Sequence, residues 1–166
     1  MSKIGSKICK NKNLKWLRDF LAPHTKRAYI VGGCVRDAML GKKISDFDVE
    51  IYGIDPAKFD ALMDQIGACG VGKNYFVYKF KNFDLSLPRT ENKTGEGHKA
   101  FEVAYADDER EASLRRDFTV NAMMINIFDG SFLDFYGGER DLKRGILRHI
   151  DDEKFAEDSL RVLRAV

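Results

Sequence analysis

Short apolar runs alternate with helical patterns along this chain and predict a mixture of helices and strands. Leu14, Leu17 and Leu21 recur at the spacing of one helix face, and Pro23 ends that helix. The predicted helices span 13–21, 35–40, 56–66, 112–121, a segment after Gly137-Gly138, and 153–166. The predicted strands span 28–31, 44–52, 75–80, 83–87, 122–127 and 132–135, and 147–150 is expected to be extended. The pattern therefore indicates a domain that contains a β-sheet with helices around it.

The strand predicted over 44–52 places its acids on one face. Side chains two positions apart on a strand point the same way, so Asp46, Asp48 and Glu50 would lie opposite the apolar face. The Asp46 and Asp48 carboxylates would then face one site. Magnesium prefers oxygen ligands, and a pair of such ions can activate a hydroxyl and bind a pyrophosphate leaving group. The alternative is an exposed strand face with solvated acids.

A Gly32-Gly33 pair precedes this strand, at the junction of a predicted strand and helix. Glycine lets backbone amides approach phosphates closely, and the start of the helix adds a favourable dipole. Arg36 could bind phosphate oxygens from one turn further on. An ordinary strand-to-helix turn is the alternative, but Asp46 and Asp48 nearby favour a site for a nucleoside triphosphate and metal ions. Asp84, on strand 83–87, is a candidate third carboxylate, with an exposed strand acid as its alternative.

Two further charged groups are candidates for contacts with a nucleotide. Arg116 could bind phosphate or ribose, and Asp117 could accept a bond from a ribose hydroxyl. Composition alone favours the alternative, in which this segment is a helix start with an acid and solvated arginines. In the last helix, the spacing of Asp158 and Arg161 permits surface ion pairing, but the same groups could read a base edge. Arg164 lies on the same side as Arg161 and would be repelled by it unless an anion lies nearby.

Composition excludes several classes of protein. The chain has 166 residues, 44% hydrophobic and 33% charged, which is typical of a soluble globular domain. The three cysteines are far apart, which predicts reduced thiols in the cytoplasm. The histidines have no metal-ligand spacing, and no long apolar run predicts export or a membrane span. The polar, glycine-containing segment 90–99 predicts a mobile loop.

Four motifs in order resemble the head domain of bacterial-type tRNA nucleotidyltransferases (CCA-adding enzymes) and the related bacterial poly(A) polymerases, in the DNA polymerase β nucleotidyltransferase superfamily. The resemblance runs from about Tyr29 to Val166. The motifs are Gly32-Gly33-x-Val35-Arg36-Asp37 with Asp46-x-Asp48, then Arg115-Arg116-Asp117-Phe118-Thr119-x-Asn121-Ala122, Asp134-Phe135-Tyr136-Gly137-Gly138-x-x-Asp141-Leu142, and Glu157-Asp158-x-x-Arg161 followed by Arg164. The fold that this resemblance implies is α+β, a small mixed sheet with flanking helices followed by the start of a helical neck.

The resemblance also implies roles for these residues. Asp46 and Asp48 would bind two catalytic Mg²⁺ ions, with Asp84 as the possible third ligand. The nucleotide, CTP or ATP, would be bound by Gly32, Gly33, Arg36, Arg116, Asp117, Asn121, Glu157, Asp158, Arg161 and Arg164. Within this set, Arg116 and Asp117 would contact the ribose, while Asp158 and Arg161 would pair with the base. The protein itself would then serve as the template. The segment 89–110 matches the flexible loop of the family, which takes part in switching from CTP to ATP.

The expected organisation is a basic helical segment over 1–26, the nucleotidyltransferase head over 27–150 and the beginning of the neck over 151–166. The chain ends within a predicted helix, so we expect it to be part of a longer protein whose remaining domains grip the tRNA. Residues 1–166 alone should bind nucleotide weakly and extend tRNA poorly. An A-adding enzyme, a CC-adding enzyme or a poly(A) polymerase would share the same motifs. A non-catalytic RNA- or nucleotide-binding module is the alternative from another class.

Overall fold

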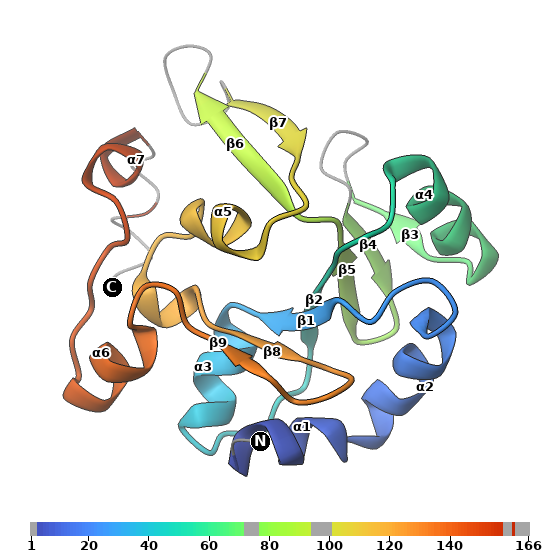
Figure 1. Ribbon diagram of the computed structural model, residues 1–166, viewed down its shortest axis with the longest axis horizontal. Coiled ribbons are helices and arrows are strands. Elements are labelled where there is room, and N and C mark those ends of the chain that lie inside the picture. The colour runs from blue at the N-terminus through green and yellow to red at the C-terminus, as the bar shows by residue number, and fades with distance from the viewer. Residues whose placement is uncertain (1–2, 72–76, 94–100, 158–160, 162–166) are drawn as a thin grey trace.

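The computed structural model describes residues 3–71, 77–93, 101–157 and 161. Its centre is a seven-stranded mixed sheet in the order β3-β4-β5-β2-β1-β8-β9 (Figure 1). These strands are β1 (Ala28–Val31), β2 (Phe47–Ile51), β3 (Cys69–Gly70), β4 (Val77–Phe80), β5 (Phe83–Ser86), β8 (Met124–Asn126) and β9 (Phe132–Leu133). The helices are α1 (Lys3–Cys9), α2 (Lys12–Leu21), α3 (Gly33–Met39), α4 (Pro56–Gln65), α5 (Glu109–Leu114), α6 (Gly138–Arg144), α7 (Asp152–Glu157) and the 3₁₀ turn η1 (Thr119–Asn121). The predicted α+β class is confirmed.

The pairing of the strands brings distant acids together. β1 is antiparallel to both of its neighbours, β2 and β8. β2 runs parallel to β5, and their register sets Asp48 directly beside Asp84. β4 and β5 pair as an antiparallel hairpin, and the start expected for the first of these strands at 75–76 lies outside the described residues. Parallel pairing of β2 and β5 therefore aligns two acids from separate segments at one place on the sheet.

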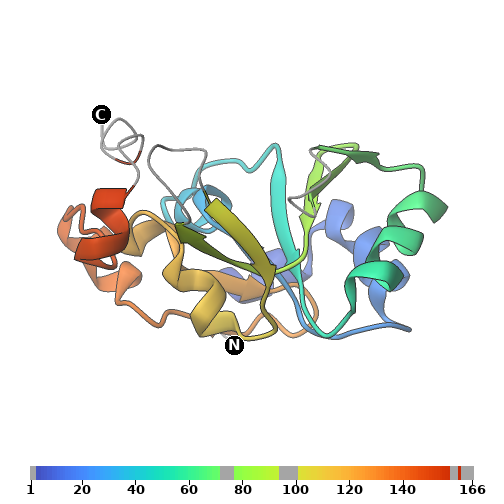
Figure 2. The same cartoon turned by 90° about the horizontal axis from the view of Figure 1, so that it is seen from above.

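Apolar side chains cover both faces of the sheet. On one face, α2 packs Leu14, Leu17 and Leu21 against the larger core cluster, and all three have no exposed surface. Asn11 caps this helix by accepting a hydrogen bond from the amide of Asn13, so α2 begins where its sequence predicts. The smaller cluster, on the other face, contains Tyr29, Val31, Tyr52, Ala112 and Met124. The molecule is flattened, with α4 on one side and α6 and α7 on the opposite side (Figures 1 and 2).

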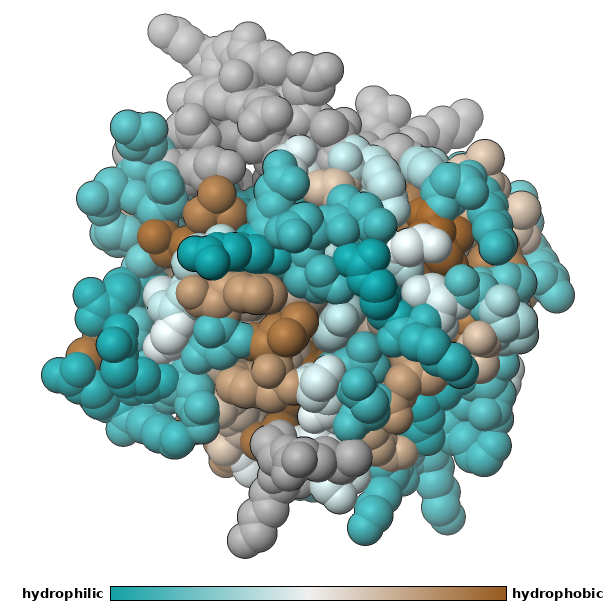
Figure 3. Space-filling view, viewed as in Figure 1, coloured by the Kyte–Doolittle hydropathy of each residue, from teal (hydrophilic) through white to brown (hydrophobic). Residues whose placement is uncertain are grey.

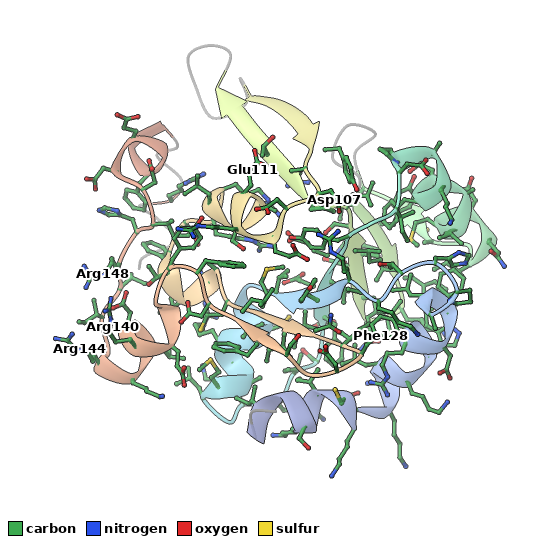
Figure 4. All side chains as sticks on the ribbon, in the orientation of Figure 1. Asp107, Glu111, Phe128, Arg140, Arg144 and Arg148 are labelled. Carbon is green, nitrogen blue, oxygen red and sulfur yellow. The ribbon has the colours of Figure 1, made fainter. Side chains whose placement is uncertain are left out.

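The segment predicted as a mobile loop over 90–99 is partly a strand. β6 (Arg89–Lys93) pairs with β7 (Phe101–Tyr105) in a separate antiparallel ribbon that extends from the body (Figure 1). Residues 94–100 lie outside the described part of the chain. The loop prediction is wrong for 90–93, because its polar composition hides a backbone pairing with an apolar partner strand. At the foot of this ribbon, Arg27 binds the carboxylates of Asp107 and Glu109 at 3.0–3.1 Å (Figure 4).

The single helix predicted over 112–121 is also wrong. α5 begins earlier, at Glu109, where the Asp108 side chain accepts from the amide of Glu111, and it ends at Leu114. A turn follows, and η1 comes after it. Within the turn, the Asp117 carboxylate accepts from the amide of Phe118 at 2.8 Å. Such a local bond competes with helical hydrogen bonding and interrupts the helix at this point.

The C-terminal part of the described chain packs against η1. Gly138, at the start of α6, approaches so closely that an added Cβ would lie 2.2 Å from the carbonyl oxygen of Thr119. The extended segment predicted at 147–150 is confirmed by a strand-like bridge between Phe118 and His149. Of the helix predicted over 153–166, α7 covers the beginning, and 158–160 and 162–166 lie outside the described residues.

The face of the molecule shown in Figure 3 carries apolar surface among hydrophilic residues. In Figure 3, hydrophobic residues gather near the centre of the face around β8 and β9, bordered by hydrophilic ones. Phe132, Leu133 and Phe135 are only partly buried there. In the part of the chain that the structure describes, we find no helix with the length and apolar character needed to cross a membrane.

Candidate nucleotide and metal site

A hollow of about 250 Å³ opens where the chain passes from β1 into α3 and where β2 begins. Its lining residues are Gly33, Cys34, Asp37, Lys43, Ile44, Ser45, Asp46 and Asp48. The two predicted metal-binding acids therefore lie in one wall, beside the predicted glycine turn. Since both carboxylates face the same hollow, a cation can contact them together.

The glycine turn is required by its geometry. Gly32 has φ 67° and ψ −139°, a conformation that other residues rarely adopt. A Cβ placed on Gly32 would lie 3.1 Å from Nη1 of Arg116 and 3.9 Å from Oδ2 of Asp48. The turn, the arginine and the acid therefore surround the same space. A larger residue at 32 would push into that space, where a substrate phosphate is expected.

Cys34 connects the turn to the acidic strand. Its thiol lies 3.1 Å from the carbonyl oxygen of Asp46, and its sulfur accepts from the amide of Asp48 at 3.3 Å. Burial raises the pKa of Cys34 to about 11, so the thiol keeps its proton at neutral pH and can donate. The Cys34 side chain is partly buried. The structure shows that it also fixes the distance between α3 and the start of β2.

Asp46 and Asp48 differ in their surroundings. The strand predicted over 44–52 is shorter than expected, and Asp46 lies just before β2, where the Ser45 hydroxyl donates to its Oδ2 at 2.7 Å. Asp48 lies within β2. Burial raises the pKa of Asp48 and the neighbouring Asp84 adds to the rise, while the positive charge of Arg116 opposes it. A cation bound at Asp48 would relieve the repulsion between these two acids.

Asp84 lies beside Asp48 but has a partner of its own. The ammonium of Lys79 lies 3.4 Å from Oδ1 of Asp84. Within the described residues, no three acidic, histidine or cysteine side chains converge closely enough to enclose a metal ion. The assignment of Asp84 as a third metal ligand stays a prediction. A protein site with two carboxylates suits magnesium, which commonly takes its other ligands from water and substrate phosphates.

Glu50 does not lie on an exposed acidic face. The residue is 1% exposed, and its carboxylate accepts from Arg115 at 2.6 Å, from Arg116 at 2.5 Å and from the Tyr52 hydroxyl at 2.9 Å. Burial acts to raise the pKa of Glu50, but the charges of Arg116 and Arg115 prevail and lower it. The buried carboxylate directs Arg116 toward Gly32 and Asp48. The sequence contained one signal for this role, because Glu50 continues the alternation of Asp46 and Asp48.

Residues of the Arg115–Ala122 motif form hydrogen bonds with those of the Gly32–Asp37 motif. Arg36 donates to Oδ1 of Asn121 at 2.7 Å, and the amide group of Asn121 donates to Asp117 at 2.9 Å. This chain of contacts ties α3 to η1. Arg36 also lies 3.2 Å from the carboxylate of Asp37. The structure therefore brings Arg36, Asn121 and Asp117 together, next to Arg116, as the sequence motifs predict.

The structure describes only part of the motif that runs from Glu157 to Arg164. Arg161 is 7% exposed and donates to the backbone carbonyl of Arg115 at 3.0 Å, so it adjoins the second motif. Glu157 ends α7, and nothing is described of its side chain. Asp158 and Arg164 lie outside the described residues. The predicted pairing of Asp158 and Arg161 with a base, and their ion pairing on the helix surface, stay predictions.

Comparison with known proteins gives consistent matches. The family described as Poly A polymerase head domain matches residues 28–148. The Multifunctional CCA protein of Nitrosococcus oceani is 45% identical over 141 residues, and that of Xanthomonas campestris pv. campestris is 42% identical over 144 residues. These stretches cover 82% and 84% of this chain but 33% and 34% of the relatives. The chain therefore spans about a third of the length of the curated relatives it matches.

Solved structures with the same fold include two ligand complexes. The Bacillus stearothermophilus CCA-adding enzyme in complex with CTP superposes with a TM-score of 0.73 at 27% identity, covering 99% of this chain and 38% of that one. The Thermotoga maritima CCA-adding enzyme complexed with tRNA gives a TM-score of 0.66 at 27% identity, covering 96% of this chain and 39% of that one. An apo form of a CCA-adding enzyme superposes with a TM-score of 0.79 at 27% identity, and the match covers 98% of this chain and 41% of that one.

Proposed function

The chain belongs to the family of poly A polymerase head domains, and from this premise we propose that it is the catalytic head of a template-independent RNA nucleotidyltransferase. In this proposal the protein adds CMP and AMP, from CTP and ATP, to the 3′ end of tRNA. The observation that carries the proposal is the hollow shared by Asp46, Asp48 and the Gly32-Gly33 turn. The relatives named as CCA proteins favour this reaction over other uses of the same fold.

The residues of the hollow divide the work of nucleotidyl transfer. The 3′-hydroxyl of the RNA attacks the α-phosphate, and pyrophosphate leaves. Backbone amides at the Gly32-Gly33 turn can approach the phosphates closely, and the guanidinium groups of Arg36 and Arg116 supply positive charge beside them. Asp117, held by Asn121, is positioned to orient the ribose. Phosphoryl transfer depends mainly on the positioning of the reactants and on stabilisation of the developing negative charge. These groups provide both without a covalent nucleophile.

Magnesium fits this site through the chemistry of its donors. Asp46 and Asp48 offer carboxylate oxygens toward one hollow, and the raised pKa of Asp48 indicates that its negative charge lacks full compensation within the protein. Two Mg²⁺ ions held there would make the attacking hydroxyl more acidic and stabilise the charge on the leaving pyrophosphate. Asp84 stands beside Asp48 and is the available third carboxylate.

The same premise supports a division of the chain. We propose that residues 27–150 form the nucleotidyltransferase head, that 1–26 form a basic helical segment packed on it, and that 151–166 begin a helical neck. Leu14, Leu17 and Leu21 of the first segment are completely buried against the sheet, so this segment contributes to the core of the head. Packing contacts cross both proposed boundaries. Leu14, Leu17 and Leu21 belong to the core of the head, and Phe155 packs against Phe118.

Replacing each metal-binding acid tests the proposal directly. In the full protein, Asp46→Ala or Asp48→Ala should lower the rate of CMP transfer to tRNA by at least about 10³-fold, because the residual site cannot hold the charge-stabilising ions. Asp64→Ala provides the matched control, since Asp64 is an exposed acid on α4. Circular dichroism should show an unchanged fold in all three variants. Retention of wild-type activity by either site variant would refute the metal assignment.

Two further measurements separate the alternatives. Incubation of the full protein with tRNA lacking its terminus and with each nucleotide singly distinguishes CCA addition from A-addition, CC-addition and poly(A) synthesis. The matched family name, which mentions poly A polymerase, makes the last of these the main alternative. Calorimetry tests for magnesium-dependent CTP binding, and its absence would count against the proposed enzyme. Magnesium-dependent transfer of CMP to tRNA would count against a non-catalytic module, which could bind CTP but not transfer CMP.

A further inference from the structure

A second hollow, of about 360 Å³, adjoins the catalytic one. We call it the α1 groove. Its lining residues are Ile4, Lys7, Ile8, Asn11, Asn13, Ala38, Gly41, Lys42, Lys43 and Ile44. Lys43 and Ile44 line both hollows, so the α1 groove lies next to the site of Asp46 and Asp48. Its volume falls within the range of small-molecule sites in proteins. In Figure 1, α1 lies along the bottom of the molecule, below α3.

The chemistry of the α1 groove differs from that of the catalytic hollow. The catalytic hollow is lined by three acids, whereas the lining of the α1 groove contains three lysines and no acid. Lys42 lies 3.9 Å from the carboxylate of Asp37. Among the described residues, no acidic oxygen comes within 4.0 Å of the ammonium groups of Lys7 or Lys43. The groove therefore carries excess positive charge and complements an anionic ligand.

The floor of the groove is apolar. Ile8 is 3% exposed and belongs to the main core, while Ile4 and Ile44 are partly buried against the same cluster. Gly41, at φ 74°, adds no side chain, and an added Cβ there would meet nothing within 4 Å. A flat ring could lie on these isoleucines. Asn13 lies at the rim and can offer amide groups to the edge of a base.

We propose that the α1 groove is a second nucleotide subsite, in which a phosphate binds near Lys7 and Lys43 and the base lies on the isoleucine floor. This inference rests on the proposed nucleotidyltransferase function and concerns the substrate of the same site. The ligand is a nucleoside phosphate, and its two sources are a residue of the RNA strand or a free nucleotide. The shared lining residues Lys43 and Ile44 make the two hollows neighbours, which favours the RNA strand, because adjacent nucleotides of one strand can occupy neighbouring hollows.

The test uses two lysines that are close in sequence. Lys7 lines the groove, whereas Lys10 is exposed, carries the same charge and is absent from the lining. Binding of a short single-stranded oligoribonucleotide to the full protein is measured for wild type, Lys7→Glu and Lys10→Glu over a range of salt concentrations. We expect Lys7→Glu to weaken binding about fivefold and to reduce the salt dependence, and Lys10→Glu to change it by less than about twofold. Lys7→Ala repeats the test without a new acid.

Separate arms with CMP and with inorganic pyrophosphate identify the source of the ligand. A loss confined to the oligoribonucleotide assigns the groove to the RNA strand, and an equal loss for CMP assigns it to free nucleotide. Equal losses for Lys7→Glu and Lys10→Glu, no loss for either, or a loss for pyrophosphate alone would each overturn the subsite. These are binding measurements, so they can fail while CMP transfer by the wild type succeeds. In that case the groove inference falls and the proposed function stands.

Discussion

Replacing Glu50 by glutamine tests whether a buried carboxylate organises the nucleotide site. The Glu50 side chain is 2% exposed and accepts from Arg115 at 2.6 Å, from Arg116 at 2.5 Å and from the Tyr52 hydroxyl at 2.9 Å. Glutamine keeps the shape of the glutamate side chain and one acceptor oxygen but removes the negative charge. Its NH₂ group, itself a donor, would face the donor groups of Arg115, Arg116 or Tyr52. The two guanidinium groups would then lack their counter-charge, and one of them is the group beside Gly32.

The size of the effect follows from the burial of the partners. Removing one member of a buried ion pair costs about 3–5 kcal/mol, because the other charge stays buried without compensation. Arg115 and Arg116 keep 14% and 19% of their side-chain surface exposed, so water can solvate part of each group. We therefore expect Glu50→Gln to lower the free energy of unfolding by about 3 kcal/mol. Tyr52→Phe, which removes one neutral donor, should lower it by only about 1 kcal/mol.

Urea unfolding followed by circular dichroism provides the assay. Glu111 is an exposed glutamate on α5 (Figure 4), and Glu111→Gln makes the same chemical change with an expected effect within about 0.5 kcal/mol. A CTP titration of the folded variants gives the second readout, and Glu50→Gln should weaken CTP binding because Arg116 loses its anchor. If Glu50→Gln and Glu111→Gln unfold at the same urea concentration, the buried network does not have the energetic role that we assign to it.

The pH dependence of stability gives an independent check on Glu50. Burial alone would raise the pKa of this carboxyl, but Arg116 and Arg115 lower it below its ordinary value. A carboxyl with a lowered pKa in the folded state stabilises the protein above the pKa of the unfolded state, near 4.3 for glutamate, and loses this contribution as pH falls through the folded value. Wild type should therefore lose stability in acid more steeply than Glu50→Gln.

Two other substitutions test the packing around the site. Gly138→Ala should cost at least about 2 kcal/mol, because the new Cβ would lie 2.2 Å from the carbonyl oxygen of Thr119, whereas Gly41→Ala, at φ 74° in open space, should cost only about 1 kcal/mol. Equal losses in thermal unfolding would contradict this. Trp16 is the single tryptophan and stacks on Phe80 at 5.0 Å, so Phe80→Ala should shift its fluorescence to longer wavelength and cost about 1–2 kcal/mol. An unchanged emission maximum would contradict the stack.

The parts of the site that could be predicted from sequence are the local ones. Asp46 and Asp48 are two residues apart, one just before β2 and one within it, and the alternation of extended chain puts their carboxylates on the same side. The conformation of Gly32 follows from a tight turn between an apolar strand and a helix. Glu50 obeys the same alternation, but its burial depends on Arg115 and Arg116. These arginines come from a distant segment, and a single sequence contains no measure of that pairing.

The errors in the predicted elements have a similar origin. The helix predicted over 112–121 begins with helix-favouring residues, but 117–121 have lower helix propensity. Asp117 also binds its neighbouring amide and Arg116 binds Glu50, so the chain turns between α5 and η1. The strand over 89–93 is polar because its ribbon extends away from the main sheet, and period-two hydrophobic patterning is therefore absent. In both places tertiary partners override local propensity.

One face of β2 combines catalysis and stability. Asp48 lies at the hollow, while Glu50, two residues on, is buried in a network with two arginines. Arg116 connects these two positions, because it binds Glu50 and also lies beside Gly32 and Asp48. In the proposed function, the positive charge of Arg116 that would attract a triphosphate is held in place by the buried Glu50. If Arg116 binds the nucleotide as proposed, folding and nucleotide binding depend on the same arginine, and we expect a change at Glu50 to alter both.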